Sequence, residues 1–126
     1  PDLNAPFILR TDASSRAIGA CLMQEHNGTI HPVIYASRKL LDRETSYSTI
    51  ELEALSLVWG CLKFAKYLEA QHFIIQTDHK PLTVLKVNNS SNKRLQRWAL
   101  SLQHFNFTID PIPGSENACA DVLSRL

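Results

Sequence analysis

Two aspartates stand directly after short apolar runs of the sequence. The run Phe7–Leu9 leads into Asp12, and the run Phe73–Ile75 leads into Asp78. Consecutive apolar residues of this length are typical of strands that are buried on both faces of a sheet. If the two strands are parallel neighbours, both carboxylates lie outside the carboxyl ends of the strands, where open α/β sheets usually bind their ligands.

Two carboxylates in these positions favour a cation between them. Neighbouring strands lie about 4.8 Å apart, so acids at the same level repel each other unless a positive charge separates them. Mg²⁺ prefers carboxylate oxygen, and two such ions about 4 Å apart can activate a water molecule and stabilise the leaving oxygen of a phosphodiester. Asp121, among small residues near the end of the sequence, is a candidate third ligand. The pattern predicts a site of the nuclease type; the alternative is that each aspartate only forms a turn or a cap.

A basic segment follows Asp78. No acid occurs between Asp78 and Asp110, although the net charge of the chain is only +1. A basic segment beside an acidic metal site suits a nucleic-acid backbone, and the candidate phosphate contacts are Lys93, Arg94 and Arg97. The alternative is a solvated helix face.

The rest of the pattern indicates the elements that must position these residues. The Asn27-Gly28 pair predicts a tight hairpin. Apolar residues at spacings of three and four from Ile50 to Leu68 predict a long helix with Ser46 or Ser48 as its N-cap, and Trp98 is expected to face the core from a later helix. Strands in hairpins, followed by a helix that crosses to a further strand, predict one mixed sheet with helices on its faces, which is the α/β class. The expected strands cover residues 7–11, 17–24, 30–36, 73–77 and 105–109, and the expected helices cover 45–68, 93–104 and 118–126, with a short helix or turn after residue 81.

Composition is that of an ordinary globular domain. The 126 residues include 13 Lys and Arg against 12 Asp and Glu, with 44% hydrophobic residues, which is enough for a core that needs no disulfide or metal to fold. No apolar run approaches the roughly 18 residues of a membrane span. Three widely spaced cysteines form no zinc pattern and favour a reducing intracellular compartment. A chain that starts at Pro1 without an initiator Met indicates a piece of a longer protein.

Several segments become distinctive when they are taken together. They are residues 11–14 (TDAS), 35–40 (YASRKL), 47–53 (YSTIELE), 77–82 (TDHKPL), 96–98 (QRW) and 114–125 (GSENACADVLSR). On these motifs, which span nearly the whole chain in order, the sequence resembles the ribonuclease H domain of Ty3/gypsy-type LTR retrotransposon reverse transcriptases.

The resemblance implies a single domain over residues 1–126 with an RNase H-like fold, a five-stranded mixed sheet flanked by helices. It implies an endonuclease that cleaves the RNA strand of RNA/DNA hybrids during reverse transcription, with two Mg²⁺ ions for which Mn²⁺ can substitute. One ion activates water and the other stabilises the departing 3′ oxygen, which leaves 5′-phosphate and 3′-hydroxyl ends. Four acids hold the metal, and Asp12, Asp78 and Asp121 follow by motif.

The same resemblance implies partners and a place in the cell. The partners are the RNA/DNA hybrid and the polymerase and connection domains of the same polyprotein, with no membrane. The hybrid is expected to be recognised by shape and by its 2′-hydroxyl groups rather than by sequence. The location is cytoplasmic, in a virus-like particle if the parent element is active.

The fourth acid is a glutamate early in the long helix, and there are two candidates. Glu51 and Glu53 point about 200° apart on a helix, so only one can face the site. Helical periodicity places Glu51 nearer the centre of the apolar stripe. The family pattern, a glutamate followed by an apolar stretch, matches Glu53. We assign Glu53 as the metal ligand, because a ligand in the first turn need not point at the centre of the core, and Glu51 as a solvated or capping acid.

One feature departs from many ribonucleases H, and two other functions compete. The segment 111–120 contains no histidine, where other members carry one thought to help product release, so slower or differently assisted turnover is expected. One competing function is a catalytically weak or inactive module that binds hybrid or a polymerase domain. The other is an integrase or resolvase of the wider fold, against which the motifs at 77–82 and 120–125 argue.

Overall fold

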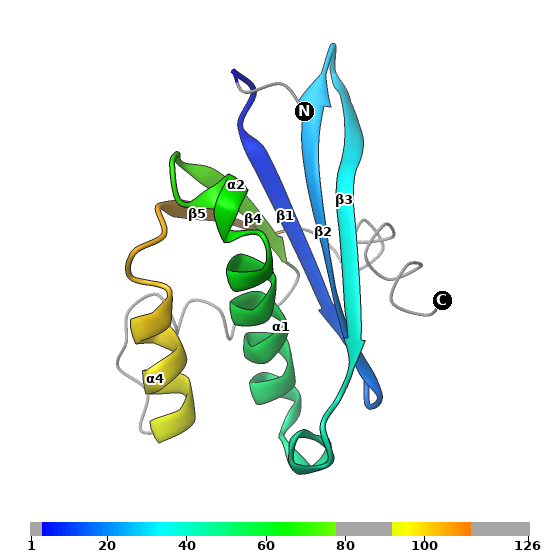
Figure 1. The fold of residues 1–126 in the computed structure, drawn as a ribbon, viewed down its shortest axis with the longest axis vertical. Helices are drawn as coiled ribbons and strands as arrows, with labels where there is room; N and C mark the ends of the chain where they lie inside the picture. Colours follow the sequence, from blue (N-terminus) through cyan, green and yellow to red (C-terminus); the bar gives the residue numbers. More distant parts are fainter. Residues whose placement is uncertain (1–3, 78–91, 112–126) are drawn as a thin grey trace.

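The computed structural model describes residues 4–77 and 92–111, which carry five strands and four helical segments (Figure 1). The strands are β1 (Phe7–Ala13), β2 (Ala17–His26), β3 (Thr29–Lys39), β4 (Phe73–Thr77) and β5 (Phe107–Pro111). The helical segments are the 3-10 helix η1 (Asp42–Ser46), α1 (Thr49–Lys63), α2 (Ala65–Leu68) and α4 (Lys93–Ser101).

The strands form one mixed sheet in the order β3-β2-β1-β4-β5. The meander β1-β2-β3 is antiparallel, whereas β4 is parallel to both β1 and β5. In the parallel pair, Ile8 lies beside Ile74, and the Arg10 side chain donates a 2.6 Å hydrogen bond to the Gln76 amide oxygen. The predicted mixed α/β sheet is confirmed. The two strands that lead to Asp12 and Asp78 are parallel neighbours, as predicted.

The predicted hairpin between β2 and β3 turns at Asn27 and Gly28. Both residues have positive φ, 54° and 81°. A two-residue turn of this kind matches the right-handed twist of the flanking strands, and Gly28 adopts it without steric cost.

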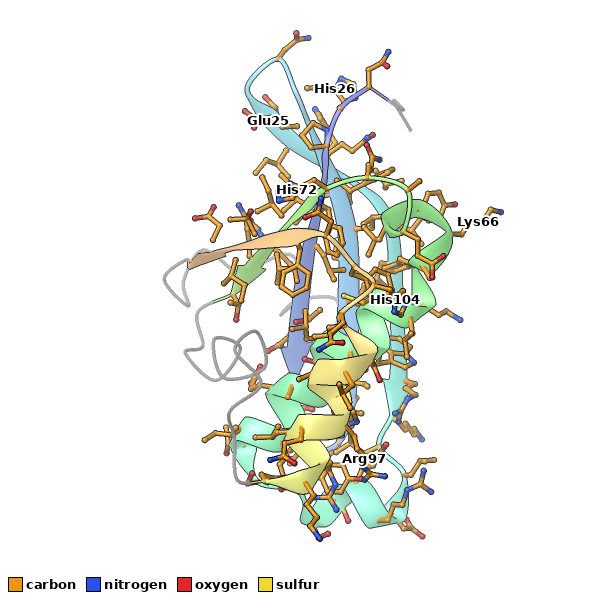
Figure 2. The ribbon with its side chains drawn as sticks, turned by 90° about the vertical axis from the view of Figure 1, so that its left-hand side faces the viewer. Glu25, His26, Lys66, His72, Arg97 and His104 are labelled. Carbon is orange, nitrogen blue, oxygen red and sulfur yellow. The ribbon has the colours of Figure 1, made fainter. Side chains whose placement is uncertain are left out.

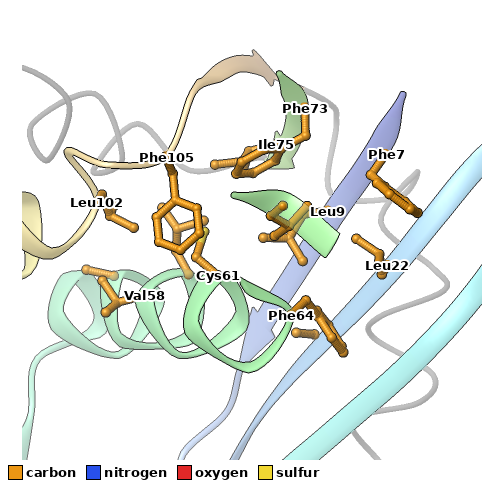
Figure 3. Close-up of a cluster of buried hydrophobic side chains, with 14 of the residues drawn as sticks. Phe7, Leu9, Leu22, Val58, Cys61, Phe64, Phe73, Ile75, Leu102 and Phe105 are labelled. Carbon is orange, nitrogen blue, oxygen red and sulfur yellow. The ribbon is translucent and has the colours of Figure 1, made fainter. Parts of the chain in front are cut away.

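Helix α1 lies across β1 and β2 and buries the main core against them (Figure 3). Gly60 makes the close approach possible, because a Cβ atom there would lie 3.0 Å from the Ala20 Cβ and 3.2 Å from the Thr11 Cγ2. The helix runs opposite to β1, so its first turns lie toward the carboxyl end of that strand (Figure 1). Helix α4 packs on another side of α1, and both helices begin at the same end of the molecule.

The elements differ from the sequence predictions at their ends, and the predicted helix at 45–68 is instead divided into the end of η1, α1 and α2. Ser48 is the N-cap of α1, as one of the two alternatives stated. Ile50, predicted in the apolar stripe, is 47% exposed, because the first turn projects beyond the sheet. The fifth strand begins at Phe107 instead of Phe105, which is buried in the turn between α4 and β5. The predicted helix at 118–126 and the turn or helix after residue 81 lie outside the described residues.

Within the described ranges, no helix is long and apolar enough to cross a membrane.

Candidate active site

Asp12 stands near the carboxyl end of the central strand. It pairs with Gly19 across to β2 and is half-buried. Thr11 and Thr77, which precede the two predicted strand-end acids, are each 4% exposed. Because β1 and β4 are parallel and in register, their carboxyl ends lie at the same edge of the sheet. Asp78 follows Thr77 in the sequence and lies outside the described residues, as does Asp121.

Glu53 lies on the face of α1 that covers the sheet. It is 8% exposed and shares that face with Leu57 and Gly60, which are four and seven residues further along the helix. Gly60 rests on Thr11, so Glu53, two turns closer to the start of the helix, lies toward the end of β1 that carries Asp12. The structure thus brings the two described members of the predicted acid set to the same end of the molecule.

Glu51 is held in a different network, at the start of α1. Its side chain accepts a 2.9 Å hydrogen bond from the Ser48 backbone N–H, while its own N–H donates to the Ser48 hydroxyl at 3.2 Å. The other carboxylate oxygen accepts from Asn92 at 3.3 Å and pairs with the Arg94 guanidinium. These hydrogen bonds, that of Ser48 first, lower the pKa of Glu51 to about 2. Glu51 is therefore a capping acid, as predicted, but it is buried and ion-paired rather than solvated.

The three predicted phosphate contacts do not form one set. Lys93 and Arg97 are exposed on α4. Arg94 is half-buried, pairs with Glu51 and stacks its guanidinium 4.1 Å from the centre of the Tyr47 ring. The Asn92 side chain caps α4 by accepting from the N–H groups of residues 94 and 95 at 2.8 and 3.2 Å.

A second ion pair fixes η1 against β3. Arg38 donates two hydrogen bonds, of 2.7 and 3.0 Å, to the two carboxylate oxygens of Glu44, which also accepts from the Leu41 N–H at 2.8 Å. The hydrogen bonds from Arg38 are the main cause of the lowered pKa of Glu44. Sequence reasoning missed this pair, and the available signal was an arginine at the end of a strand followed six residues later by a glutamate.

A cleft of about 480 Å³ opens between η1 and α4. Sequence reasoning also missed it, because its two walls come from segments some 50 residues apart that meet only in the fold. The residues that line it include Arg43, Tyr47, Arg94, Arg97, Trp98 and Ser101. Trp98 packs partly against the core, as predicted, with its remaining surface in the cleft.

Comparison with known protein families assigns the chain to a family. The family model described as an RNase H-like domain found in reverse transcriptase matches residues 2–105. The chain belongs to this family. The match runs from before β1 to beyond α4, so it includes Asp12, Glu51 and Glu53.

Curated relatives of this RNase H-like domain are retrotransposon polyproteins, which confirms the predicted Ty3/gypsy-type assignment. The chain is 41% identical over 126 residues to the retrovirus-related Pol polyprotein from transposon 412 of Drosophila melanogaster, covering 100% of this chain and 10% of the relative. It is 42% identical over 130 residues to the transposon Tf2-3 polyprotein of Schizosaccharomyces pombe, covering 99% and 10%. The chain therefore spans about a tenth of the length of these relatives.

A solved structure confirms the predicted RNase H-like fold. The crystal structure of LC11-RNase H1 in complex with an RNA/DNA hybrid superposes on this chain with a TM-score of 0.68 at 14% identity. The superposition covers 94% of each chain. At this identity the likeness shows a shared fold.

The acids of this RNase H-like domain suit a hard divalent cation. Asp12 and Glu53 offer carboxylate oxygens, the ligands that Mg²⁺ prefers. The described residues bring together no group of three or more His, Cys, Asp or Glu side chains, since two of the four predicted acids lie outside them. Cys61 is no competing ligand, because burial raises the pKa of its thiol to about 12.

Proposed function

We propose that this chain is the ribonuclease H domain of a retrotransposon reverse transcriptase and cleaves the RNA strand of RNA/DNA hybrids, with Asp12, Glu53, Asp78 and Asp121 as the metal-binding catalytic acids. One observation carries the choice of acids: Glu53 faces the sheet near the strand end that bears Asp12, whereas both oxygens of Glu51 are occupied by Ser48, Asn92 and Arg94. Asp78 and Asp121 join the set on their sequence motifs.

In the proposed mechanism this chain's residues position the reacting groups. Asp12, Glu53, Asp78 and Asp121 would hold two Mg²⁺ ions, whose chemistry would be to activate the attacking water and to neutralise the charge on the leaving 3′ oxygen. Asp12 is held in place by the paired central strand, and Glu53 by the buried first turns of α1. The capping box of Ser48 and Glu51 fixes where those turns begin, so the Glu53 carboxylate is delivered at a constant position.

The hybrid is bound outside the acid site by exposed cations. Lys93 and Arg97 are placed on α4 to contact phosphates, while Arg94 acts through Glu51 by holding the starts of α1 and α4 together. Such contacts give affinity that falls with salt and carries little sequence preference. The LC11-RNase H1 structure, which contains a hybrid, supports this class of substrate by fold.

The same proposal covers the context of the chain. Residues 1–126 form one domain of a longer polyprotein whose polymerase and connection domains are its partners, in a cytoplasmic virus-like particle. The retrotransposon polyproteins of which this chain matches about a tenth support that context.

The deciding experiment is cleavage of a labelled RNA/DNA hybrid by the 126-residue chain with Mg²⁺ or Mn²⁺. Controls are EDTA, single-stranded RNA and duplex DNA. Metal-dependent cutting of the RNA strand of the hybrid alone is the expected result. If the chain does not cut, the assay is repeated with the polymerase attached, and no cutting there either would leave a binding module instead of an enzyme.

A further inference from the structure

Among the described residues, those that line the cleft between η1 and α4 carry more positive than negative charge. Glu44, the one acid among the described lining residues, already accepts two hydrogen bonds from Arg38, and Arg94 is paired with Glu51. Arg43 and Arg97 are exposed, and neither forms an ion pair with any residue in the described ranges. Figure 2 labels Arg97 beside α4. The two free guanidinium groups can therefore receive an anion.

The floor of the cleft is aromatic and fixed. The rings of Tyr47 and Trp98 lie 6.0 Å apart at an angle of 59°. Arg94 covers Tyr47 at 4.1 Å and is itself held by Glu51, so the floor does not depend on a ligand for its shape. Planar rings beside arginines offer a stacking surface for a nucleobase as well as contacts for its phosphate.

The cleft is separate from the proposed acid site. Leu55 lines it from α1, and this residue is two positions after Glu53, about 200° around the helix. A ligand in the cleft therefore lies on the α4 side of α1, away from the face that carries Glu53. The volume of about 480 Å³ is within the usual range for small-molecule sites and is comparable with one or two nucleotides.

We propose that this cleft binds a short single-stranded nucleic-acid segment, with a phosphate between Arg43 and Arg97 and a base against Tyr47 and Trp98. The proposal rests on the proposed function for its choice of nucleic acid as the ligand. It goes beyond it by adding a binding place for unpaired strand next to the hybrid, in which Arg97 holds a phosphate of the single strand while Lys93 is left to contact the hybrid. A single strand is favoured over a duplex, because the bases of a duplex are stacked on each other and cannot reach an aromatic floor.

The test measures binding in EDTA, so that it does not depend on cleavage. A fluorescein-labelled oligothymidylate is titrated with the full 126-residue chain, and its anisotropy is followed at several salt concentrations. We expect Arg43→Gln and Arg97→Gln each to weaken binding by about threefold to tenfold. Each should lower the slope of log affinity against log salt by about 0.7, the value for one single-strand phosphate contact. Lys66→Gln, which removes one exposed charge from α2, is the matched control and should change affinity less than twofold.

A second readout reports on the aromatic floor. In a Trp59→Phe background, Trp98 is the remaining tryptophan, and oligothymidylate should quench its fluorescence with the same midpoint as the anisotropy change. Equal weakening by Lys66→Gln, or unchanged affinity in both arginine variants, would overturn the proposal. Displacement of the oligonucleotide by polyglutamate at matched charge, without quenching of Trp98, would overturn it in favour of an acidic peptide. Failure of the proposed function would be seen in the cleavage assay instead: the wild-type protein would cut no hybrid, with or without its polymerase.

Discussion

Glu51 and Glu53 lie two residues apart on α1 and are equally buried, at 9% and 8% exposure, yet they face different parts of the molecule. Glu51 points toward α4, where Ser48, Asn92 and Arg94 occupy both of its oxygens. Glu53 points toward the sheet, near the end of β1 that carries Asp12. Burial alone therefore does not tell the two carboxylates apart, whereas the part of the fold that each one faces does.

The two sides of α1 therefore have separate tasks. The α4 side sets where the helix begins, through a capping box and an ion pair between the two helix starts. The sheet side uses that fixed beginning to hold Glu53. If this division is correct, changes on one side should alter stability and changes on the other should alter cleavage.

The largest expected effect is the loss of cleavage in Glu53→Gln. Removing a ligand of the proposed metal site should lower the rate by about 100-fold or more, the usual scale for losing one electrostatic stabiliser of a transition state. The fold should be retained, since an amide of the same size replaces a buried charge. Hybrid cleavage at saturating Mg²⁺ and a thermal melt measure the two properties.

Asp12→Asn should lower the cleavage rate in the same way. The matched control is Glu69→Gln, which changes an exposed glutamate at the end of α2. Full activity in Glu53→Gln together with loss in Glu51→Gln would reverse the assignment of the two glutamates.

Glu51→Gln should have the opposite profile. It removes the charge that pairs with Arg94 and weakens the cap of α1, so the free energy of unfolding should fall by about 2–3 kcal/mol. Cleavage at a temperature well below the melting point should fall less than tenfold. Urea unfolding followed by circular dichroism measures the stability change. A normal unfolding midpoint with abolished cleavage would contradict the structural role.

The same carboxylate predicts a loss of stability in acid. Its folded pKa of about 2 lies below the usual value of 4.5, so the stabilisation is present above pH 4.5 and is lost as the pH falls toward 2. By pH 3 the loss should be about 2 kcal/mol, as an order of magnitude. Unfolding at pH 3 and pH 6 should show this difference in the wild type, and a smaller one in Glu51→Gln. An equal pH dependence in both proteins would assign the effect to other acids such as Glu44, whose pKa is also lowered.

The sheet could be predicted because its signals are local. Apolar runs mark β1 and β4, and Asn27-Gly28 marks the hairpin by the backbone conformation that the turn requires. The start of α1 could be narrowed to Ser46 or Ser48 by the same kind of signal. The carboxyl-end location of Asp12 then follows from strand order, which is a property of the fold class.

The roles of the two glutamates could not be settled by periodicity. Both sides of α1 are covered, one by the sheet and the other by α4, so a single apolar stripe does not describe the helix. Arg94 was predicted as a phosphate contact on charge alone, and its partner Glu51 is 43 residues away in the sequence. Such pairings depend on how the helices pack against each other, and a local sequence pattern does not predict that packing.

The smallest expected effect concerns the cap that joins the two helix starts. Asn92 accepts hydrogen bonds from the first turn of α4 and donates one to Glu51, so Asn92→Ala should lower the free energy of unfolding by about 1 kcal/mol. Asn106→Ala, at an exposed asparagine before β5, is the control and should lie within about 0.5 kcal/mol of wild type. In a double-mutant cycle, the variant with both Asn92→Ala and Glu51→Gln should lose less stability than the sum of the losses in the two single variants. The reason is that both substitutions affect the same hydrogen bond between Asn92 and Glu51. Full additivity would show that the start of α4 is capped independently of α1. The ion pair between Arg94 and Glu51 would then be the only contact supporting the division of α1 into a structural and a catalytic side.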